Sequence, residues 1–172
     1  MYILHTFIGG LGKDVNDGYL MAMKLTLHTD YALRVLIFLG CNTTRLASIR
    51  EIADAYGISE NHLVKVVHRL GQGGFIETVR GRGGGLRLGR SASDIVIGDV
   101  VRYTEDDLAL LGCMNAEDPA ACALMPACRL RGVLGEALSA FTTVLERYTL
   151  ADIISPFERA RLGDRPAGGG DH

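Results

Sequence analysis

The stretch from residue 48 to residue 88 constrains the fold most, because two short helical patterns are followed at once by a hairpin pattern. Ser48, with a glutamate three residues later, has the spacing of a capping box and predicts a helix over residues 49–56. Gly57 ends that helix, and Ser59 is placed to cap the next one. Two helices joined by so short a turn predict a helix-turn-helix, whose second helix can enter the major groove of DNA.

A β-hairpin is expected directly after the second helix. Residues 75–80 alternate enough for a strand, residues 81–85 form a glycine-rich turn, and residues 86–88 return as a second strand. Arg80 and Arg82 then stand at the tip, where a cation suits the negative potential of a narrow minor groove. We therefore predict a mainly α fold with a small β-hairpin, a winged helix-turn-helix. The alternative is a helical hairpin followed by an unrelated β-hairpin.

The charge distribution agrees with a DNA-binding surface in the middle of the chain. The net charge is −2, yet residues 45–90 carry eight basic and four acidic side chains, and residues 91–172 carry seven and thirteen. A local basic face is therefore compatible with an acidic whole, although a solvated charged loop is the alternative. The residues predicted to contact an operator of double-stranded DNA are Ser48, Ser59, Asn61, His62, Lys65, Arg80 and Arg82.

Apolar periodicity predicts the elements on either side of this region. A helix is expected over residues 26–39 with Gly40 as its stop, and a shorter one over residues 96–103. From Cys128 to about Ile153 apolar residues recur every three or four positions, which predicts a long helix with one strongly apolar face. That face either packs on its own domain or forms a dimer seam, and a palindromic operator would require the dimer.

The resulting organisation has five segments. We predict a poorly ordered extension or a start-site overcall at residues 1–22, a winged helix-turn-helix domain at 23–105, a loop with two of the cysteines at 106–127, a dimerisation helix at 128–154 and a disordered tail at 155–172. The apolar runs fall far short of the roughly 20 residues of a membrane span. The start also lacks the basic region and cleavage site of a signal peptide. We expect a cytoplasmic protein with no membrane partner.

Three of the four cysteines lie close together, with the spacing C-x8-C-x5-C at Cys113, Cys122 and Cys128. In a reducing cytosol such a group indicates a metal or redox centre rather than structural disulfides. The spacing differs from ferredoxin motifs and from the close cysteine pairs of structural zinc, so zinc is disfavoured. A redox switch of bare thiols stays open. Cys41, far off in sequence, is interpreted as a small buried hydrophobe.

Several stretches of the chain resemble one family of winged-helix regulators. They are KLTLHTDYALRVLIFL, SENHLVKVVHRLGQGGFIETVRGRGGGLRLG, IVIGDVVR, the three cysteines with PACRL, and ERYTLADI. In this order, over residues 23–153, they resemble the Rrf2 family and, within it, the nitric-oxide-sensing iron–sulfur repressors. The resemblance implies a homodimeric DNA-binding repressor. It also implies that residues 106–127 are a cluster-binding loop, with a 4Fe-4S or 2Fe-2S cluster held by Cys113, Cys122 and Cys128.

Three thiolates leave one coordination position on such a cluster. Carried over from the family, Asp30 of the TDY segment would fill it from the partner subunit, and His28, Glu117 and Asp118 are competing candidates. An oxygen ligand binds iron more weakly than a thiolate, so that iron would be the most open to nitric oxide. The alternative for Asp30 is a capping role in the first turn of its helix. Attack by nitric oxide on the iron would remove the bonds between these ligands and the cluster, and the affinity for DNA would fall.

Other classes of function fit the sequence less well. It contains no nucleotide-binding loop and no paired acid–base motif, so we do not expect an enzyme. One alternative is a winged-helix regulator that senses iron or the supply of iron–sulfur clusters. The other is an electron-transfer iron–sulfur protein, against which the basic wing argues.

Overall fold

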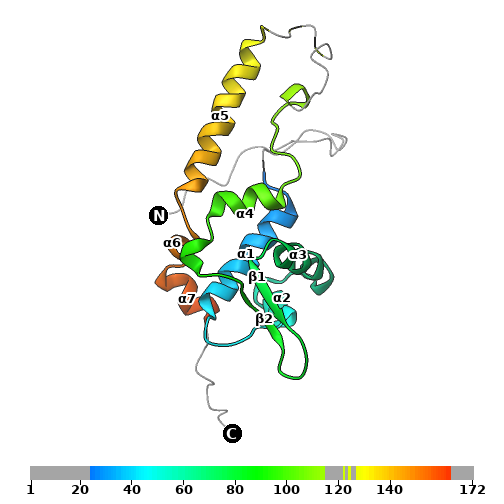
Figure 1. Ribbon diagram of the computed structural model, residues 1–172, viewed down its shortest axis with the longest axis vertical. Helices are drawn as coiled ribbons and strands as arrows, with labels where there is room; N and C mark the ends of the chain where they lie inside the picture. Colours follow the sequence, from blue (N-terminus) through cyan, green and yellow to red (C-terminus); the bar gives the residue numbers. More distant parts are fainter. Residues whose placement is uncertain (1–23, 115–121, 123, 125–126, 164–172) are drawn as a thin grey trace, which may run out of the picture.

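The described part of the chain is mainly α-helical and carries a two-stranded antiparallel hairpin, as predicted (Figure 1). The computed structural model describes residues 24–114, 122, 124 and 127–163, so the extension predicted at residues 1–22 lies outside it. The elements in chain order are α1 (Leu27–Cys41), α2 (Ile49–Tyr56), α3 (Glu60–Gln72), β1 (Ile76–Val79), β2 (Gly85–Leu88), η1 (Ala92–Asp94), α4 (Ile97–Thr104), η2 (Gly112–Met114), α5 (Arg129–Glu146), α6 (Leu150–Ile153) and α7 (Pro156–Leu162).

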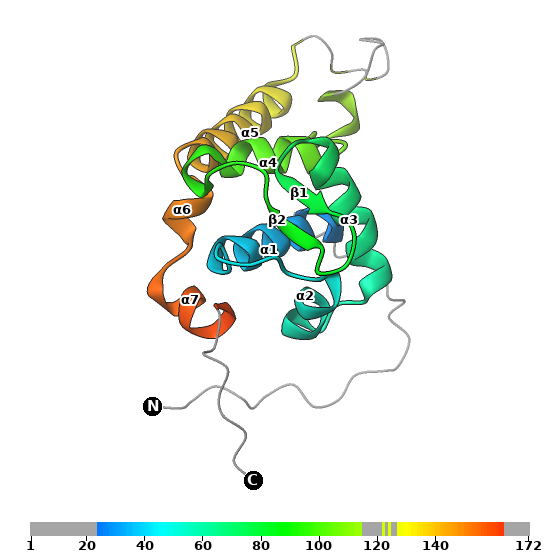
Figure 2. The ribbon, with the colours of Figure 1, turned by 60° about the horizontal axis from the view of Figure 1, so that its bottom comes forward.

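Helix α1 lies at the centre of the hydrophobic core, with the hairpin and the other short helices arranged around it (Figure 2). Ala32, Val35 and Leu36 are fully buried on this helix. Side chains from α3, α4, α6 and β2 meet them, and the burial of apolar surface holds these elements together. The domain is therefore built around a helix that precedes the helix-turn-helix in sequence.

The ends of α1 differ from the predicted ones. Thr26 is the N-cap, because its hydroxyl accepts a hydrogen bond from the Thr29 amide. At the other end the helix runs through Gly40 to Cys41, so the predicted stop at Gly40 was wrong. The physical reason is packing. A Cβ on Gly40 would overlap the Cδ1 of Ile154, so only glycine lets the segment after α6 approach so closely.

The helix-turn-helix forms from α2 and α3 as predicted. The Ser48 amide donates to Glu51 Oε2 (2.6 Å) and the Glu51 amide donates to Ser48 Oγ (3.2 Å), which completes the capping box. Gly57 takes up a left-handed conformation with φ of 65°, which glycine tolerates without strain, and it turns the chain into α3. The local signals of the sequence therefore predicted this motif correctly.

The hairpin is attached to the helix-turn-helix on two sides. Its strands pair antiparallel, with Ile76 opposite Leu88, and β1 packs against α3. Ala47, just before α2, forms an isolated bridge with Leu86 on the edge of β2 that β1 does not occupy. The hairpin is thereby held beside the second helix, in the position of a wing.

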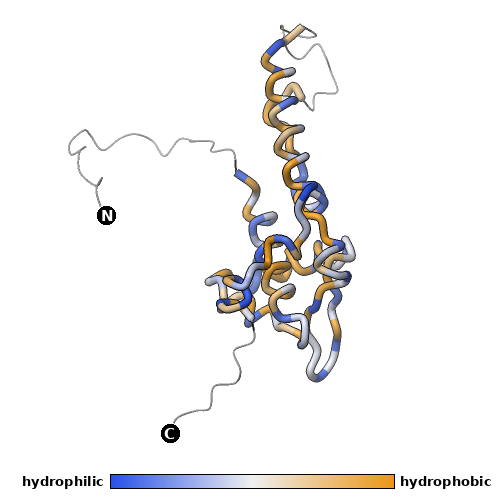
Figure 3. The backbone as a smooth tube through the Cα atoms, turned by 90° about the vertical axis from the view of Figure 1, so that its left-hand side faces the viewer, coloured by the Kyte–Doolittle hydropathy of each residue, from blue (hydrophilic) through white to orange (hydrophobic). Residues whose placement is uncertain are grey.

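Helix α5 projects away from the rest of the molecule and carries apolar residues along its length (Figures 1 and 3). None of its residues is buried, and Leu130 and Val133 are 57% and 62% exposed. Its C-terminal end is fixed to α4, because Arg102 bonds to both Asp99 and Glu146. The apolar face is therefore only partly covered by the chain's own domain. Among the described residues, no helix is long and apolar enough to cross a membrane.

The prediction of one continuous helix to residue 153 was wrong. Helix α5 ends at Glu146, and α6 begins after Thr149. Thr149 pairs with Val96 in an isolated bridge, and it joins Asp152 in a capping box. Hydrogen bonds to the segment before α4 therefore interrupt the apolar periodicity, because they satisfy backbone groups that a continuous helix would have paired internally.

The disordered tail predicted from residue 155 was wrong for its first part. Ser155 opens α7 with a capping box, and Pro156 takes a first-turn position, where its missing N–H does no harm. Asn42 Nδ2 donates to the Leu162 carbonyl oxygen (2.7 Å), which fixes α7 to the end of α1. The capping box and this tertiary contact stabilise a helix in a segment that was predicted to be disordered because of its composition. Residues 164–172 lie outside the described part.

Candidate functional site

Helix α3 separates an apolar face from a polar one. Leu63 and Leu70 are fully buried in the core. Asn61, His62 and Lys65 are exposed, as the helical spacing predicted. Amide, imidazole and ammonium groups can all donate hydrogen bonds to base edges or phosphates. The outer face of α3 therefore has the chemistry of a helix that reads the major groove.

The two serines predicted at the interface differ in their partners. Ser48 is held by the capping box, and its Oγ also donates to Glu51 Oε2 (2.9 Å). Ser59 is exposed at the N-cap of α3, yet its side chain makes no capping hydrogen bond. A hydroxyl at a helix N-terminus is well placed for a phosphate oxygen. Ser59 is thus the better suited of the two, because the Ser48 hydroxyl is already engaged.

The sequence-based prediction missed Val64. This side chain is 51% exposed on the outer face of α3, where Asn61 and Lys65 are its polar neighbours. The signal was present, because the buried positions of α3 at Leu63, Val66, Val67 and Leu70 define the inner face and leave Val64 outside it. An exposed valine on such a face can contact the methyl group of thymine.

The four arginines of the hairpin region have different roles. Arg87 forms an ion pair across the two strands (2.8 Å), and Arg90 lies over the Phe75 ring, 4.5 Å from its centroid. Arg80 and Arg82 are exposed, and no ion pair found within residues 24–114 and 127–163 involves either of them. Their charges are therefore free for an external anion, as the prediction of a wing tip requires.

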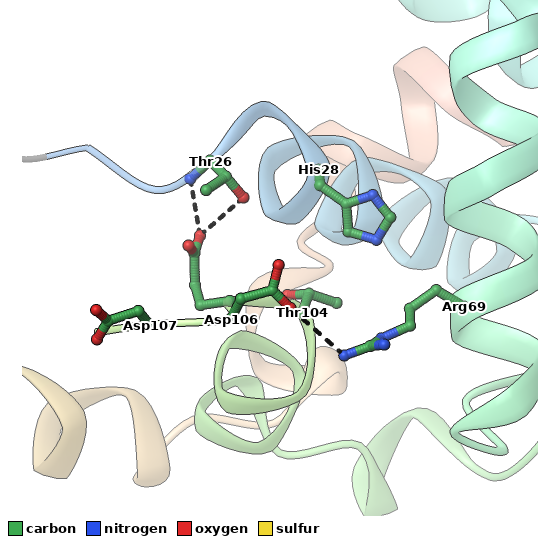
Figure 4. A pocket seen from close by; sticks show the side chains of 7 residues that line it. Thr26, His28, Arg69, Thr104, Asp106 and Asp107 are labelled. Atoms are coloured by element: carbon green, nitrogen blue, oxygen red, sulfur yellow. Dashed lines mark hydrogen bonds and ion pairs between the residues drawn. The ribbon is translucent and has the colours of Figure 1, made fainter. Parts of the chain in front are cut away.

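A hollow of about 430 Å³ lies between the start of α1, the last turns of α3 and the end of α4 (Figure 4). His28, one of the alternative ligands, lines it together with Arg69 and two threonines at helix ends. Three acidic residues complete the lining, namely Glu105, Asp106 and Asp107. No cysteine is among these residues, so within one chain His28 faces charged groups rather than thiols.

The three clustered cysteines border a short turn and the start of α5. Cys113 lies in η2, and Cys128 is the N-cap of α5. These two and Cys122 are free, partly exposed thiols. Within the described part of the chain, no three His, Cys, Asp or Glu side chains lie close enough together to hold a metal ion. The single chain thus presents accessible thiols that are not gathered into one site.

A second hollow, of about 380 Å³, opens beside Cys128. It is lined by Met114, Cys128, Arg131, Gly132 and Gly135. A Cβ on Gly135 would lie 3.9 Å from Met114 Cε, so the turn that holds Cys113 rests against the first turns of α5. Gly132 and Gly135 have no side chains to fill this hollow, and Arg131 adds a positive charge to it. Among the described residues that line this hollow, Cys128 supplies the one thiol, the kind of ligand that iron–sulfur clusters use.

Asp30, predicted as the fourth ligand, is engaged within its own helix. Arg34 Nη2 lies 2.9 Å from Asp30 Oδ2, and Arg34 Nε donates to Asp30 Oδ1 (3.0 Å). Thr26 is the N-cap residue of α1, and Asp30 is an acid in the first turn, where the helix dipole favours it, so the alternative role for Asp30 fits the structure as well. The Asp30 side chain is 40% exposed, so a second molecule can reach it. The other candidates, Glu117 and Asp118, lie outside the described residues.

Cys41 lies at the end of α1, partly buried against the apolar core. Burial raises the pKa of its thiol, and burial also raises the pKa of Tyr56, which is close to it, to about 12. Because the thiolate is the metal ligand and the nucleophile, a thiol held protonated is a poor candidate for either role. This agrees with the interpretation of Cys41 as a packing residue.

Comparison with known proteins places the chain in a family. The Rrf2 family model, described as an iron-dependent transcriptional regulator, matches residues 25–156. The chain belongs to the Rrf2 family. Two curated proteins named HTH-type transcriptional regulator NsrR, from Bacillus licheniformis and Bacillus subtilis, are 55% and 53% identical to it over 133 residues. The matches cover 77% of this chain and 92% and 90% of the relatives, so the predicted resemblance to this type of Rrf2 regulator is confirmed.

Solved structures share the fold of this Rrf2 chain. CymR, the global cysteine regulator of B. subtilis, has a TM-score of 0.63 at 26% identity and covers 77% of this chain and 97% of its own. IscR of T. potens has a TM-score of 0.61 at 25% identity, with 84% and 96% covered. The predicted winged-helix class is confirmed. The chain is a DNA-binding transcriptional regulator and not an enzyme, as its Rrf2 relatives are named regulators.

Proposed function

We propose that this Rrf2 regulator is a homodimeric repressor that binds a palindromic operator and senses nitric oxide through an iron–sulfur cluster. One observation carries the proposal: a chain 55% identical to a regulator named NsrR has three free, partly exposed thiols between α4 and α5. Cys113, Cys122 and Cys128 would hold the cluster, because thiolates are its usual protein ligands. When bound, a 4Fe-4S or 2Fe-2S cluster supplies iron that is open to attack by nitric oxide.

The DNA-binding surface of the proposal combines α3 with the wing. Asn61, His62 and Lys65 contact base edges or phosphates in the major groove, with Ser48 and Ser59 toward the DNA backbone. Arg80 and Arg82 extend this surface to the minor groove. Support comes from the exposure of these side chains and from the absence of ion pairs to either wing arginine in the described part of the chain. Unpaired cations bind phosphates without first losing a partner.

The dimer seam of the proposal is the apolar face of α5. Leu130, Val133 and Val144 are between 42% and 62% exposed, and a second copy of the helix would cover them. Arg102 fixes the base of α5 to α4, so the direction in which the helix leaves the domain is set by the fold. Two domains held in this way present their recognition helices about one DNA turn apart, roughly 34 Å. That spacing suits a palindromic operator.

The fourth ligand of the proposal is Asp30 from the second copy of the chain. Its carboxylate lies at the surface, and Arg34 holds it in one orientation. A carboxylate oxygen binds iron less tightly than a thiolate, which leaves this position the easiest to displace. The ligand set and the dimer then depend on each other. Loss of the ties made by Asp30 and the cysteines frees the connector, lowers the affinity for DNA and relieves repression.

Two measurements on the anaerobically purified protein test the proposal. Absorption spectroscopy should show a visible chromophore, and a mobility-shift titration with promoter fragments should show binding that nitric oxide weakens about tenfold or more. The description of the family model as iron-dependent favours a second candidate, an iron sensor. DNA release by an iron chelator but not by nitric oxide would select it. A chromophore without any DNA binding would indicate an electron carrier.

A further inference from the structure

Arg69, in the last turns of the recognition helix α3, is turned toward α4. Its guanidinium carbon lies 4.8 Å from the centroid of the Tyr103 ring, and its Nη2 donates to the Tyr103 carbonyl oxygen (3.1 Å). Tyr103 belongs to the last turn of α4, where carbonyl groups have no partner within the helix. Arg69 therefore caps the end of α4 with a cation, which the helix dipole favours.

The same junction begins the connector that leads to the cysteines. Arg69 Nη2 lies 3.9 Å from Asp106 Oδ1 (Figure 4). Glu105 Oε1 accepts hydrogen bonds from the Thr26 amide (2.7 Å) and the Thr26 hydroxyl (3.1 Å), at the N-cap of α1. The connector then runs to the turn that holds Cys113. Its first residues are thus tied both to the recognition helix and to the start of α1.

Tyr103 extends the tie to the wing. Its ring lies 5.4 Å from the Phe75 ring, centroid to centroid, and Arg90 lies over the Phe75 ring. A Cβ on Gly73 would lie 2.8 Å from atoms of both rings, so the glycine that ends α3 makes room for this packing. The contacts form a row that joins the recognition helix, α4 and the wing, in the order Arg69, Tyr103, Phe75 and Arg90.

We propose that Arg69 is a positioning residue that couples the cysteine connector to the recognition helix. The inference rests on the proposed function, because it requires a connector whose state changes. A rearrangement around Cys113 displaces the end of α4, and Arg69 passes that displacement to α3. The Asp106 side chain is 97% exposed, so its ion pair contributes little. The cation–π contact and the hydrogen bond to Tyr103 carry the coupling.

The matched control for Arg69→Ala is Arg90→Ala. Arg90 also stacks on an aromatic ring of the row and donates to a backbone carbonyl, that of Gly73, but it does not touch α4 or the connector. The probe is a promoter fragment selected by the wild-type protein. Its affinity is measured for the cluster-loaded protein and for the same protein after removal of iron by a chelator, and the ratio of the two affinities is the readout.

For the wild type we expect a ratio of about tenfold or more, within the usual range of allosteric coupling. In Arg69→Ala the two affinities should lie within about threefold of each other, because the loaded form falls to the level of the cluster-free form. Arg90→Ala should keep the wild-type ratio. Hydrogen exchange adds a readout independent of DNA. Iron removal should alter the exchange of α3 amides in the wild type and in Arg90→Ala but not in Arg69→Ala.

Two outcomes would overturn the coupling role. One is a wild-type ratio in Arg69→Ala, and the other is an equal loss of affinity in both states, which a purely structural residue would give. Tyr103→Leu and Arg69→Lys provide the same test if Arg69→Ala does not fold, since each removes only part of the contact and should give an intermediate ratio. Equal affinities of the loaded and cluster-free wild type would instead overturn the proposed function itself.

Discussion

The DNA-binding domain, residues 24–104, and the cysteine-bearing arm, which is described at residues 105–114, 122, 124 and 127–146, are built in opposite ways. In the domain, α1 is buried on most sides, and side-chain caps at Thr26 and Ser48 begin α1 and α2. In the arm, α5 has no buried residue, and its N-cap, Cys128, makes no capping hydrogen bond. The core of the domain is therefore well covered and is completed by Leu150 and Ile154 from beyond α5, whereas the apolar face of α5 stays partly uncovered within the single chain.

Apolar burial and exposed ion pairs contribute different amounts of free energy in the arm. Complete burial of an exposed leucine or valine side chain contributes about 1.5–3 kcal/mol, and Leu130 and Val133 still have more than half of their surface to bury, so this apolar face favours a partner. The polar ties at the other end of the arm, such as Arg102 with Asp99 and Glu146, are exposed and contribute less, but they set direction. The contacts at the C-terminal end of α5 thus orient the arm, while its apolar face stays available for a partner.

The largest expected effect is the removal of an arm thiol. Cys113→Ala, Cys122→Ala and Cys128→Ala should each abolish the visible chromophore and specific operator binding, because too few thiolates remain to hold a cluster. The thermal melt should stay close to that of the cluster-free wild type, since none of these side chains is in the core. Cys41→Ala is the control and should keep both properties. A full-strength chromophore in Cys122→Ala would contradict the ligand assignment.

A charge on the seam should separate the arm from the domain. Val133→Asp places a carboxylate on the exposed apolar face of α5, so we expect a monomer in analytical ultracentrifugation and at least tenfold weaker operator binding, with the domain still folded by circular dichroism. Ser139→Asp, on the opposite side of the helix, should remain a dimer with wild-type affinity. A dimeric Val133→Asp would place the seam elsewhere.

The Asp30 carboxylate tests the link between the arm of one copy and the domain of the other. Asp30→Ala should remain folded and dimeric, yet change the spectrum of the loaded protein and its reaction with nitric oxide. The lost pair with Arg34 is partly exposed, so the free energy of unfolding should fall by only about 0.3–0.5 kcal/mol. An unchanged spectrum in anaerobic absorption measurements would transfer the ligand role to His28 or to an acid of the cysteine loop.

Within the domain, the wing arginines offer a smaller effect. Arg82→Ala should weaken operator binding by several-fold and reduce the salt dependence of the binding constant by about one phosphate contact, because an unpaired cation is lost. Arg87→Ala removes an arginine that already pairs with Glu77. It should leave unchanged the slope of the logarithm of the binding constant against the logarithm of the salt concentration. Titrations at several salt concentrations measure both. Equal slopes for Arg82→Ala and the wild type would mean that the wing tip does not touch DNA.

The smallest expected effect concerns a cap inside the domain. The pKa of the Glu51 carboxyl is lowered, first of all by the hydrogen bond from the Ser48 amide. A lowered pKa contributes stability that is present above the unfolded-state pKa and is lost as pH falls through the folded-state value. Glu51→Gln should therefore be less stable than the wild type by about 0.3–1 kcal/mol at neutral pH, and the gap should close in acid. Urea unfolding at neutral and acidic pH measures it.

Much of the domain could be predicted from its sequence because its signals are local. The capping box at Ser48, the left-handed turn at Gly57 and the glycine-rich hairpin each depend on residues a few positions apart. Three predictions failed for the opposite reason. The helix expected from residue 128 to residue 153 is interrupted after Glu146, where Thr149 pairs with Val96. Gly40 was read as a helix stop, but it lies within α1, where Ile154 packs on it, and Ser155 opens a helix that docks on Asn42 near the end of α1.

The candidate site divides in the same way. The residue types and spacing of Cys113, Cys122 and Cys128, and the outward positions of Asn61 and Lys65, were readable from the chain, because ligand chemistry and helical period are properties of the sequence. The sequence did not reveal that Arg87 and Arg90 are already engaged, or that Arg69 faces α4.

The sequence by itself therefore determined the elements whose signals are local, the helix-turn-helix and the hairpin, and which chemical groups the chain carries. Only the tertiary structure decided which of those groups are used up internally and which stay free for DNA. The physical reason is that a charged side chain becomes free or paired through neighbours that are distant in sequence, as Arg69 is through Tyr103. Such neighbours meet only after the apolar core around α1 has brought their helices together.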